Sequence, residues 1–466
     1  MKSRRKNLKS KIKSLSLRAR KKTMINLPQA FVGQAKKLLG DEYPLFEQAL
    51  NDAPSLSVRA NDKMTYTPSD ERVIWCESGF YLRERPLFTA DPFFHAGIYY
   101  VQEASSMFLV EIVKQFFLDA ERVLDLCAAP GGKSTLLAQT LPEKSLLVSN
   151  EIIRQRANIL AENMIKWGNP NVVITNNKPS DFAVLSGFFD AMVVDAPCSG
   201  EGMFRKDAQA IAEWSEQNVE MCAKRQREIL TDVWSALKTN GILVYSTCTY
   251  NCEENEKNVR WICEELDAEF LKINLKGNNQ ITANDYGYRF YPHKTRGEGF
   301  FIAVLRKKQE TSNFKISKKE LGKKTTILYK ENLPFRLKNQ VEFIILQENE
   351  KVKAYPANKK DDFALLNNNL KVVHSGICLG EIKGRDFIPD ISVALSKSLD
   401  LSLADKVEIN YETAISYLKR ENIFLENEKK GYLLVTYKNQ PLGWVKNLGN
   451  RCNNLYPQEW RIRMNI

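Results

Sequence analysis

Two cysteines and one aspartate stand just after the apolar runs that mark buried strands. Asp195 ends the run 191–195 and is followed by Cys198, while Cys248 follows the run 242–246. The carboxyl ends of neighbouring parallel strands meet at one crevice, so we expect both thiols to face a shared pocket. Either thiol taken alone is more often a buried packing residue. Two thiols at strand ends, each in a polar turn, indicate a catalytic role rather than packing.

A third strand end carries a glycine turn. The stretch ERVLDLCAAPGGKS, residues 121–134, reads as a strand, a turn with one Pro and two Gly residues, and a helix start. Such a turn lets a ligand approach the backbone and points helix N–H groups at negative charge. A P-loop needs glycine where this chain has Cys127, and the fingerprint G-x-G-x-x-G is absent. The turn predicts a nucleotide-type site of another kind, with Glu151 about twenty residues on to hold ribose hydroxyls.

A thiolate beside such a site suits methylation of a pyrimidine ring. Addition of sulfur to carbon 6 of the ring makes carbon 5 a nucleophile that can attack a methyl group on a sulfonium. The proton on carbon 5 must then be removed and the sulfur expelled, so a second group is useful for release. Asp195 could favour the protonated pyrimidine or accept a hydrogen bond from its amino edge. The reactive thiol must be substantially ionised, which needs a nearby dipole or positive charge.

Strands and helices alternate through the middle of the chain. We expect strands at 123–126, 146–149, 172–175, 191–195, 242–246 and 300–305, and helices at 102–117, 133–141, 153–167, 221–238 and 253–266. This alternation predicts an α/β fold, a doubly wound parallel sheet with helices on both faces. The three chemical stretches then lie at the carboxyl ends of its strands, where ligands bind.

Smaller units are expected on both sides of this sheet. A helix over 28–50, a mixed stretch that includes 57–61, and a pair of strands near 73–75 and 79–82 indicate an appended N-terminal unit. In this unit Arg59 could contact phosphate or form a solvated salt bridge. Residues 306–326 are rich in Lys and Ser and read as a linker. Beyond it, short apolar runs separated by turn residues indicate an α+β or mostly β region that divides near residue 395.

The end of the chain mixes aromatic and basic side chains. Between residues 443 and 463 stand Trp444, Tyr456 and Trp460 with Lys446, Arg451, Arg461 and Arg463. This composition suits irregular or single-stranded RNA, where stacking and phosphate contacts combine. Ordinary surface strands with extended Arg side chains are the alternative.

The formal net charge of +12 is concentrated at the start of the chain. Eleven of the 68 Lys and Arg lie in residues 1–23, which hold no Asp or Glu, so the remainder carries 57 basic against 56 acidic side chains. This polar basic tail cannot bury a core. Three interpretations stay open: an RNA-contacting arm, a start chosen upstream of Met24, and an Arg- and Ser-rich transit peptide.

Nine scattered cysteines, an odd number, do not form a disulfide framework in a chain of this length. They indicate a reducing compartment, and we expect a cytoplasmic protein. No C-x-x-C pair occurs, so we expect no metal site. No run of eighteen apolar residues occurs, and we expect no membrane partner.

Three motifs in fixed order carry a resemblance to a known family. VLDLCAAPGGKS, VVDAPCSGEGMFRKD and LVYSTCTYNCEENE resemble the Sun-type RNA cytosine-5 methyltransferases. The C-terminal GNRCNNLYPQEWRIR is similar to the branch of that family that acts on small-subunit ribosomal RNA. The resemblance implies a Rossmann-like S-adenosylmethionine-dependent methyltransferase core, S-adenosyl-L-methionine as methyl donor, and a PUA-like RNA-binding unit at the end.

The resemblance also implies roles for individual residues. In that family the cysteine of the TC motif, here Cys248, is the nucleophile, and the cysteine of the PC motif, here Cys198, assists release. Asp195 would lie at the junction of cofactor and base, and Glu151 would hold the ribose. The turn that would contact the methionine part of the cofactor comprises Cys127, Ala128, Ala129, Pro130, Gly131, Gly132 and Lys133. Adenine contact is open, since Asn177 stands where some relatives carry an acid, and Arg205 with Lys206 could meet RNA phosphate or form a solvated loop.

These expectations divide the chain into five parts. They are a flexible basic tail (1–24), an N-terminal RNA-binding domain (25–90), a catalytic domain (91–308), a linker with an accessory α+β domain (309–395) and a PUA-like domain (396–466). The expected activity is methylation of carbon 5 of a cytosine in 16S ribosomal RNA, by a monomer that contacts ribosomal RNA or the small subunit. The alternatives are the same chemistry on another RNA such as tRNA, a non-catalytic ribosome assembly factor, and an NTPase that Cys127 already argues against.

Overall fold

The computed structural model describes residues 25–69, 71–312, 314, 326–327, 333–339, 342–425 and 429–464. The predicted basic tail, residues 1–24, and much of the predicted linker lie outside these residues. No helix in the described part of the chain combines the length and apolar character needed to span a bilayer.

The N-terminal unit begins with two helices rather than one. Helix α2 (Gln29–Leu39) is followed by the 3-10 turn η1 (Gly40–Glu42) and by α3 (Tyr43–Asn51). The sequence predicted a single helix over 28–50, and this was wrong. Gly40 has φ +53°, a left-handed backbone that glycine adopts without strain, and it ends α2 there.

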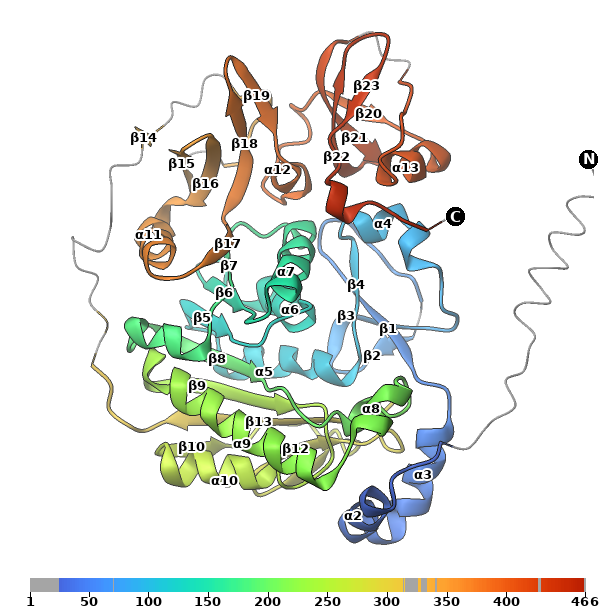
Figure 1. Cartoon of the computed structure of the whole chain (residues 1–466), viewed down its shortest axis with the longest axis vertical. Helices are drawn as coiled ribbons and strands as arrows, with labels where there is room; N and C mark the ends of the chain where they lie inside the picture. Colours follow the sequence, from blue (N-terminus) through green and yellow to red (C-terminus); the bar gives the residue numbers. More distant parts are fainter. Residues whose placement is uncertain are drawn as a thin grey trace, which may run out of the picture.

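The aromatic faces of α2 and α3 pack on the catalytic unit. The ring of Phe31 lies 5.0 Å from that of Phe204, and the ring of Phe46 lies 5.0 Å from that of Tyr250, both edge-to-face. Phe204 and Tyr250 belong to the loops that follow the catalytic strands, so this helix pair covers those loops from outside (Figure 1).

A four-stranded antiparallel sheet completes the N-terminal unit. Its spatial order is β2 (Arg72–Val73), β3 (Cys76–Leu82), β1 (Leu56–Ala60) and β4 (Tyr99–Val101), with η2 (Phe88–Ala90) and α4 (Pro92–His95) between β3 and β4. Strand β4 belongs to this sheet although it lies beyond residue 90, where the sequence placed the end of the unit. The pairing of β4 with β1 is a long-range contact, and no local sequence pattern predicts it.

The largest sheet confirms the predicted doubly wound α/β fold. Five parallel strands form its centre in the order β9 (Leu237–Thr247), β8 (Phe189–Asp195), β5 (Arg122–Asp125), β6 (Leu146–Asn150) and β7 (Val172–Thr175). The chain direction across the sheet reverses between β5 and β8, and such a switch point leaves a crevice at the carboxyl ends of the strands.

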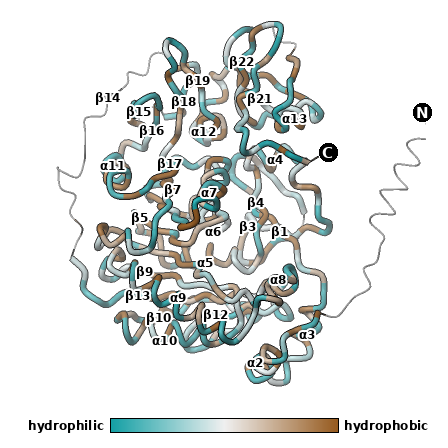
Figure 2. The backbone as a smooth tube through the Cα atoms, in the orientation of Figure 1, coloured by the Kyte–Doolittle hydropathy of each residue, from teal (hydrophilic) through white to brown (hydrophobic). Residues whose placement is uncertain are grey.

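Helices cover both faces of this sheet. One face carries α5 (Leu109–Phe116), preceded by η3 (Ser105–Phe108), together with α6 (Gly132–Thr140) and α7 (Arg154–Trp167). The other carries η4 (Pro179–Leu185), α9 (Glu216–Val233), η6 (Trp234–Ala236) and α10 (Glu256–Glu265). Helices α7 and α9 carry both hydrophilic and hydrophobic residues (Figure 2), because each of these two helices buries only one side. The connection from β8 to α9 adds η5 (Glu201–Met203) and α8 (Ala208–Glu213).

Antiparallel strands extend the sheet at both edges. Beside β9 lie β13 (Phe300–Lys307), then β12 (Gly287–Phe290) and β11 (Thr282–Asn284), while β10 (Ala268–Leu271) pairs with the end of β13. At the opposite edge β17 (Val372–Ser375), from the accessory region, pairs with β7. The sequence predicted β13 but none of the other four. Strand β17 covers an edge that would otherwise present unpaired backbone groups.

Two small sheets follow in the C-terminal region. The first contains β14 (Thr326–Ile327), β15 (Phe343–Glu348), β16 (Lys351–Pro356), β18 (Ile377–Lys383) and β19 (Asp386–Pro389), with η9 (Ala357–Lys359), α11 (Lys360–Asn369) and α12 (Ile391–Leu395). The second contains β20 (Lys406–Glu408), β21 (Gly431–Tyr437), β22 (Gln440–Asn447) and β23 (Cys452–Asn454), with α13 (Tyr411–Leu418) and η10 (Gln458–Trp460). Figure 1 shows both above the catalytic sheet, the second next to α4.

The aromatic residues near the end of the chain belong mainly to the core. Trp444 is 2% exposed and donates its indole N–H to the Asp390 carbonyl at 2.9 Å, and Tyr456 is fully buried. Trp460 is half-buried, and the Lys166 ammonium lies 5.3 Å from the centre of the Trp460 ring. Trp444 and Tyr456 therefore stabilise this unit and cannot serve as exposed stacking platforms for RNA bases.

Candidate active site

The glycine turn joins β5 to α6 at the centre of the sheet. Gly131 has φ +118° and caps α6, which begins at Gly132. A side chain at Gly131 would strain this backbone. The first N–H groups of α6 have no intrahelical partner and point along the helix axis, as predicted for a turn that accepts a negatively charged part of a ligand.

A buried carboxylate supports this turn from below. Asp125, the last residue of β5, is fully buried and accepts the Ser134 hydroxyl at 2.6 Å through Oδ2. Its Oδ1 has no hydrogen-bond partner in the described structure. Burial raises the pKa of Asp125 to about 7, although the Ser134 hydrogen bond acts in the opposite direction.

Two further carboxylates face the same turn. Glu151 follows β6, is 3% exposed, and accepts the Ile153 amide at 2.9 Å and the Arg156 guanidinium at 3.2 Å. Asp195 ends β8 and accepts the Ser246 hydroxyl at 2.8 Å. The negative charges of Glu151 and Asp195 both contribute to the raised pKa of Asp125. The three acids therefore lie close to one another.

Lys133 connects the glycine turn to the base side of the crevice. Its ammonium lies 2.8 Å from Asp195 Oδ2, and its side chain is 14% exposed. Burial by itself lowers the pKa of Lys133, but the Asp195 carboxylate outweighs it and the net shift is upward. Cys248 also contributes to this upward shift, so Lys133 and this cysteine interact electrostatically.

The two cysteines meet, as the sequence predicted. The Sγ atoms of Cys198 and Cys248 are 3.1 Å apart, and both side chains are partly exposed. They meet because β8 and β9 are adjacent parallel strands in which Asp195 pairs with Ser246. The loops after the two strands therefore start at the same level of the sheet.

The electrostatics of the two thiols differ. The hydrogen bond with Cys248, then burial and the negative charges of Cys248 and Glu254, raise the pKa of Cys198 well above its usual range. Cys198 is therefore held as a thiol, the form that can donate a hydrogen bond to the neighbouring sulfur. Cys127, on the glycine turn, is also held as a thiol because burial raises its pKa.

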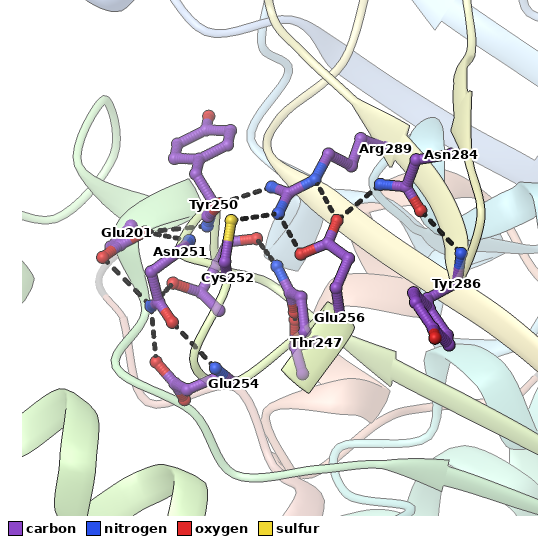
Figure 3. A network of polar contacts seen from close by, with 12 residues as sticks. Glu201, Thr247, Tyr250, Asn251, Cys252, Glu254, Glu256, Asn284, Tyr286 and Arg289 are labelled. Atoms are coloured by element: carbon purple, nitrogen blue, oxygen red, sulfur yellow. Dashed lines mark hydrogen bonds and ion pairs between the residues drawn. The ribbon is translucent and has the colours of Figure 1, made fainter. Parts of the chain in front are cut away.

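A buried polar network that the sequence did not reveal fixes both cysteine loops. Asn251 donates to Glu201 at 3.1 Å and to Glu254 at 2.8 Å, and it lies between the two carboxylates (Figure 3). Glu254 accepts the Ser199 amide, next to Cys198, at 3.0 Å. Glu201 accepts the Tyr250 amide, two residues after Cys248, at 2.8 Å. The acidic cluster NCEENE contains Asn251 and Glu254 of this network. From the sequence it was interpreted only as the start of a helix.

A second part of the network ties the Cys248 loop to the sheet. Arg289 of β12 donates to the Tyr250 carbonyl and to both carboxylate oxygens of Glu256, and its guanidinium lies 3.5 Å from Cys252 Sγ (Figure 3). The side chain of Arg289 is 4% exposed. This arginine comes from a strand that the sequence did not predict, so its role was invisible before the fold was known.

Three polar residues considered from the sequence have structural partners here. Arg205 is buried against Glu298 at 2.7 Å and does not reach solvent as a phosphate contact, while Lys206 shares Glu298 at 3.3 Å. Asn177, the candidate for adenine contact, donates to Asp181 at 2.9 Å and is buried.

Arg59 is neither a phosphate contact nor a solvated salt bridge. It is fully buried, donates to Gln102 at 2.7 Å, Thr135 at 2.6 Å and Gln139, and its guanidinium lies 4.4 Å from the centre of the Trp167 ring. Both interpretations from the sequence were wrong, because β1 turns this side chain toward α6 and α7.

The crevice fits S-adenosylmethionine. The buried Asp125 Oδ1, which has no hydrogen-bond partner in the described structure, can accept a hydrogen bond from the methionine ammonium. The free N–H groups at the start of α6 match its carboxylate. Among the described residues, no group of three or more His, Cys, Asp or Glu is arranged to hold a metal ion.

Three family models match successive parts of the chain. Residues 117–306 match 16S rRNA methyltransferase RsmB/F, residues 27–104 match the N-terminal domain of 16S rRNA methyltransferase RsmF, and residues 404–462 match the methyltransferase RsmF PUA domain. The first covers the glycine turn and both cysteine loops.

Known proteins are similar over most of the chain. Ribosomal RNA small subunit methyltransferase F of Escherichia coli O1:K1 is 31% identical over 425 residues, 87% of each chain, and that of Erwinia tasmaniensis is 30% identical over 93% of this chain and 96% of its own. The solved structure of a methyltransferase homolog protein from Pyrococcus horikoshii is 27% identical, with TM-score 0.52 over 61% of this chain and 96% of its own. NSun6 from the same organism, at 20% identity and TM-score 0.53 over 62% of this chain and 100% of its own, shares the fold. The chain therefore belongs to the ribosomal RNA small subunit methyltransferase F family, with an S-adenosylmethionine-dependent methyltransferase core of Rossmann-like fold.

Proposed function

We propose that the chain transfers a methyl group from S-adenosylmethionine to carbon 5 of a cytosine in 16S ribosomal RNA. The observation that carries this proposal is the 3.1 Å approach of two thiols beside the Lys133–Asp195 ion pair at the strand ends. Family membership supports ribosomal RNA as the substrate, and the PUA domain match supports RNA as the partner.

Cys248 is the nucleophile in this proposal. Its sulfur forms a bond to carbon 6 of cytosine, and the ring electrons move to carbon 5. Lys133 supplies positive charge beside this sulfur, and Cys198 donates a hydrogen bond to it. Asp195, held by Lys133 and Ser246, accepts hydrogen bonds from the amino edge of the ring and favours its protonated form.

S-adenosylmethionine supplies an electrophilic methyl group whose transfer to carbon 5 breaks the bond between that methyl carbon and the sulfonium sulfur. The glycine turn with Asp125 and Glu151 holds the donor. Release then requires that a base removes the proton on carbon 5. The electron pair of that C–H bond forms the double bond between carbons 5 and 6, and the pair of the bond between carbon 6 and the Cys248 sulfur leaves with the sulfur. Cys198 assists this elimination as the neighbouring thiol that can donate a hydrogen bond to the departing sulfur.

Two cysteine variants test these roles. Cys248→Ala removes the nucleophile, so transfer of tritiated methyl groups to undermethylated small-subunit RNA should fall by at least about three orders of magnitude while S-adenosylmethionine binding is retained. Cys198→Ala should accumulate a protein–RNA adduct that survives denaturation, because elimination is slowed. Cys263→Ala, a partly exposed thiol on α10, is the matched control and should behave as the unmodified protein. A fully active Cys248→Ala protein would contradict the assignment.

A further inference from the structure

A cavity of about 590 Å³ lies in the N-terminal unit, outside the catalytic crevice. Its walls come from the loop before β2 and from the segment between β3 and β4. Three aromatic rings line it, those of Tyr66, Phe88 and Tyr99. This volume is within the range of sites that enclose a small ligand, roughly 300–1,000 Å³, and it is sufficient for one nucleotide.

The aromatic wall is pre-formed. The rings of Tyr66 and Tyr99 are stacked, with centres 5.2 Å apart and planes 9° from parallel, and the Phe88 ring lies 6.1 Å from Tyr99. Tyr99 is buried, whereas Tyr66 and Phe88 are half-buried and line the cavity. Half-exposed rings supported by buried rings are suitable platforms on which an unpaired base can stack.

Two arginines stand at the opening. Arg83 is 80% exposed at its side chain and lies 3.5 Å from Glu71. Arg85 is exposed, and its guanidinium lies 5.7 Å from the centre of the Phe88 ring. No ion pair of Arg85 is found within the described ranges, so its charge is available to a phosphate beside the stacked base.

Two carboxylates also line the cavity, Glu84 and Asp91. Asp91 is fixed in place, since it accepts the Tyr99 hydroxyl at 2.7 Å and the Phe93 amide at 2.9 Å. Glu84, between Arg83 and Arg85 in the sequence, is exposed. Carboxylates are acceptors only, so they match an exocyclic amino group of a base and do not match uracil carbonyls.

The cavity lies between the catalytic loops and the C-terminal unit. On one side, Arg296 pairs with Glu71, the residue that Arg83 also contacts, and three residues later Gly299 touches the Cys198 loop at Gly202. On the other side, α4 contacts the C-terminal unit, where the ring of Phe93 lies 5.7 Å from that of Tyr437. The segments that form the cavity therefore contact the catalytic unit through Glu71 and the C-terminal unit through α4.

We propose that this cavity binds one unpaired nucleotide of the substrate RNA, distinct from the target cytosine, whose base carries an exocyclic amino group. The base stacks on Tyr66 and Phe88, its amino group donates to Glu84 or Asp91, and Arg85 contacts the adjoining phosphate. This inference rests on the proposed function for the identity of the RNA, but the site itself can be tested with RNA alone.

Binding of labelled hexaadenylate to the full chain tests the site. Phe88→Leu keeps an apolar side chain but removes the stacking surface, and Arg85→Ala removes an exposed charge; each should weaken binding about tenfold, given that one stacked base contributes about 1–3 kcal/mol. Arg225→Ala, an exposed arginine on α9, is the matched control and should bind as the unmodified chain. The hexamer of purine riboside, which lacks the amino group, should bind more weakly than hexaadenylate. In the Glu84→Gln variant, the difference in affinity between the two hexamers should be smaller.

Methyl-transfer kinetics separate this inference from the proposed function. For small-subunit RNA, Phe88→Leu and Arg85→Ala should raise KM about tenfold and leave kcat within twofold, because the cavity binds substrate away from the reacting atoms. Suppose that the unmodified chain methylates RNA, but both variants match Arg225→Ala in hexaadenylate binding and in KM. The cavity proposal is then overturned, and the proposed function stands. If hexaadenylate binding depends on Phe88 and Arg85 while no methyl transfer occurs, the cavity stands and the proposed function fails.

Discussion

At the scale of single residues, the two cysteines at the strand ends have different surroundings. Cys198 and Cys248 are 3.1 Å apart, yet the Glu254 carboxylate adds to the effects that hold Cys198 protonated. Lys133 interacts electrostatically with Cys248. The surroundings of the two sulfurs therefore differ in charge, which supports the different roles that we propose for them.

This asymmetry can be measured by removing the Glu254 charge. In a Cys248→Ala background, Glu254→Gln should lower the pKa of Cys198, because a like charge no longer opposes the thiolate. Alkylation of Cys198 by iodoacetamide as a function of pH reports this pKa directly. Glu253→Gln is the control, since the neighbouring Glu253 is exposed and pairs with Lys257. Equal alkylation profiles for the two variants would show that Glu254 does not act on the thiol.

At the scale of elements, the active site depends on the close approach of two loops. The Gly202 amide donates to the Cys248 carbonyl at 2.8 Å. A Cβ atom at Gly202 would lie 2.6 Å from the Gly299 carbonyl oxygen and 2.8 Å from that of Cys248. Both are backbone atoms, so neither can move aside without moving its loop.

Gly202→Ala should therefore displace the Cys248 loop and reduce methyl transfer about a hundredfold, the usual cost of misplacing reacting groups by about 1 Å. Gly33→Ala is the matched control, because no atom lies within 4 Å of a Cβ there and Gly33 is inside α2. That variant should raise the free energy of unfolding by about 0.5–1 kcal/mol. Initial rates of methyl transfer and thermal unfolding of both variants test these predictions. A fully active Gly202→Ala protein would show that the close approach of the two loops is not needed for activity.

At the scale of the whole molecule, buried polar side chains join the units. Arg59 of the N-terminal sheet donates to residues of α6 and stacks on Trp167 of α7. His95 of α4 lies between the N-terminal and C-terminal units, with Nε2 at 3.0 Å from the Thr89 carbonyl and Nδ1 at 3.3 Å from the Tyr456 hydroxyl. These contacts fix the C-terminal unit relative to the catalytic sheet.

Loss of Arg59 should destabilise the chain strongly. Arg59→Met would leave the acceptors on Gln102, Thr135 and Gln139 without their donor in a buried site, at a cost of about 3 kcal/mol. Arg72→Met removes an arginine of the same sheet that lies exposed over the Phe80 ring and should cost less than about 1 kcal/mol. Thermal unfolding of the two variants compares them. Similar losses would mean that the buried hydrogen bonds contribute little.

His95 should make stability depend on pH. Burial, then the charge of Lys166, lowers its pKa to about 3 from 6.5. Below pH 6.5 the unfolded chain binds a proton at His95 that the folded chain does not, so stability falls as the pH decreases from about 6.5 toward 3. His95→Gln should remove about one proton from the uptake on unfolding, measured by urea unfolding at pH 7.5 and 5. An unchanged pH dependence would show that the ring is protonated in the folded chain.

The central fold was readable from the sequence because its signals are local. Apolar runs of four to six residues and helical spacing located the five parallel strands and the helices between them, and motif order placed Asp195, Cys198 and Cys248 at their carboxyl ends. The edge strands β10, β11, β12 and β17 were not found. They are short, carry no regular alternation, and are strands only because a neighbouring strand supplies hydrogen bonds.

By itself, the sequence determined the α/β core, the three chemical stretches and their order, since periodicity and turn residues are properties of adjacent positions. The tertiary structure alone decided that Arg59 and Arg205 are buried, that Trp444 and Tyr456 are core, and that Asn251 bridges Glu201 and Glu254. It also decided which carboxylate faces Cys198. The physical reason is that burial and charge environment arise from residues far apart in the chain, and one sequence carries no record of the distances between them.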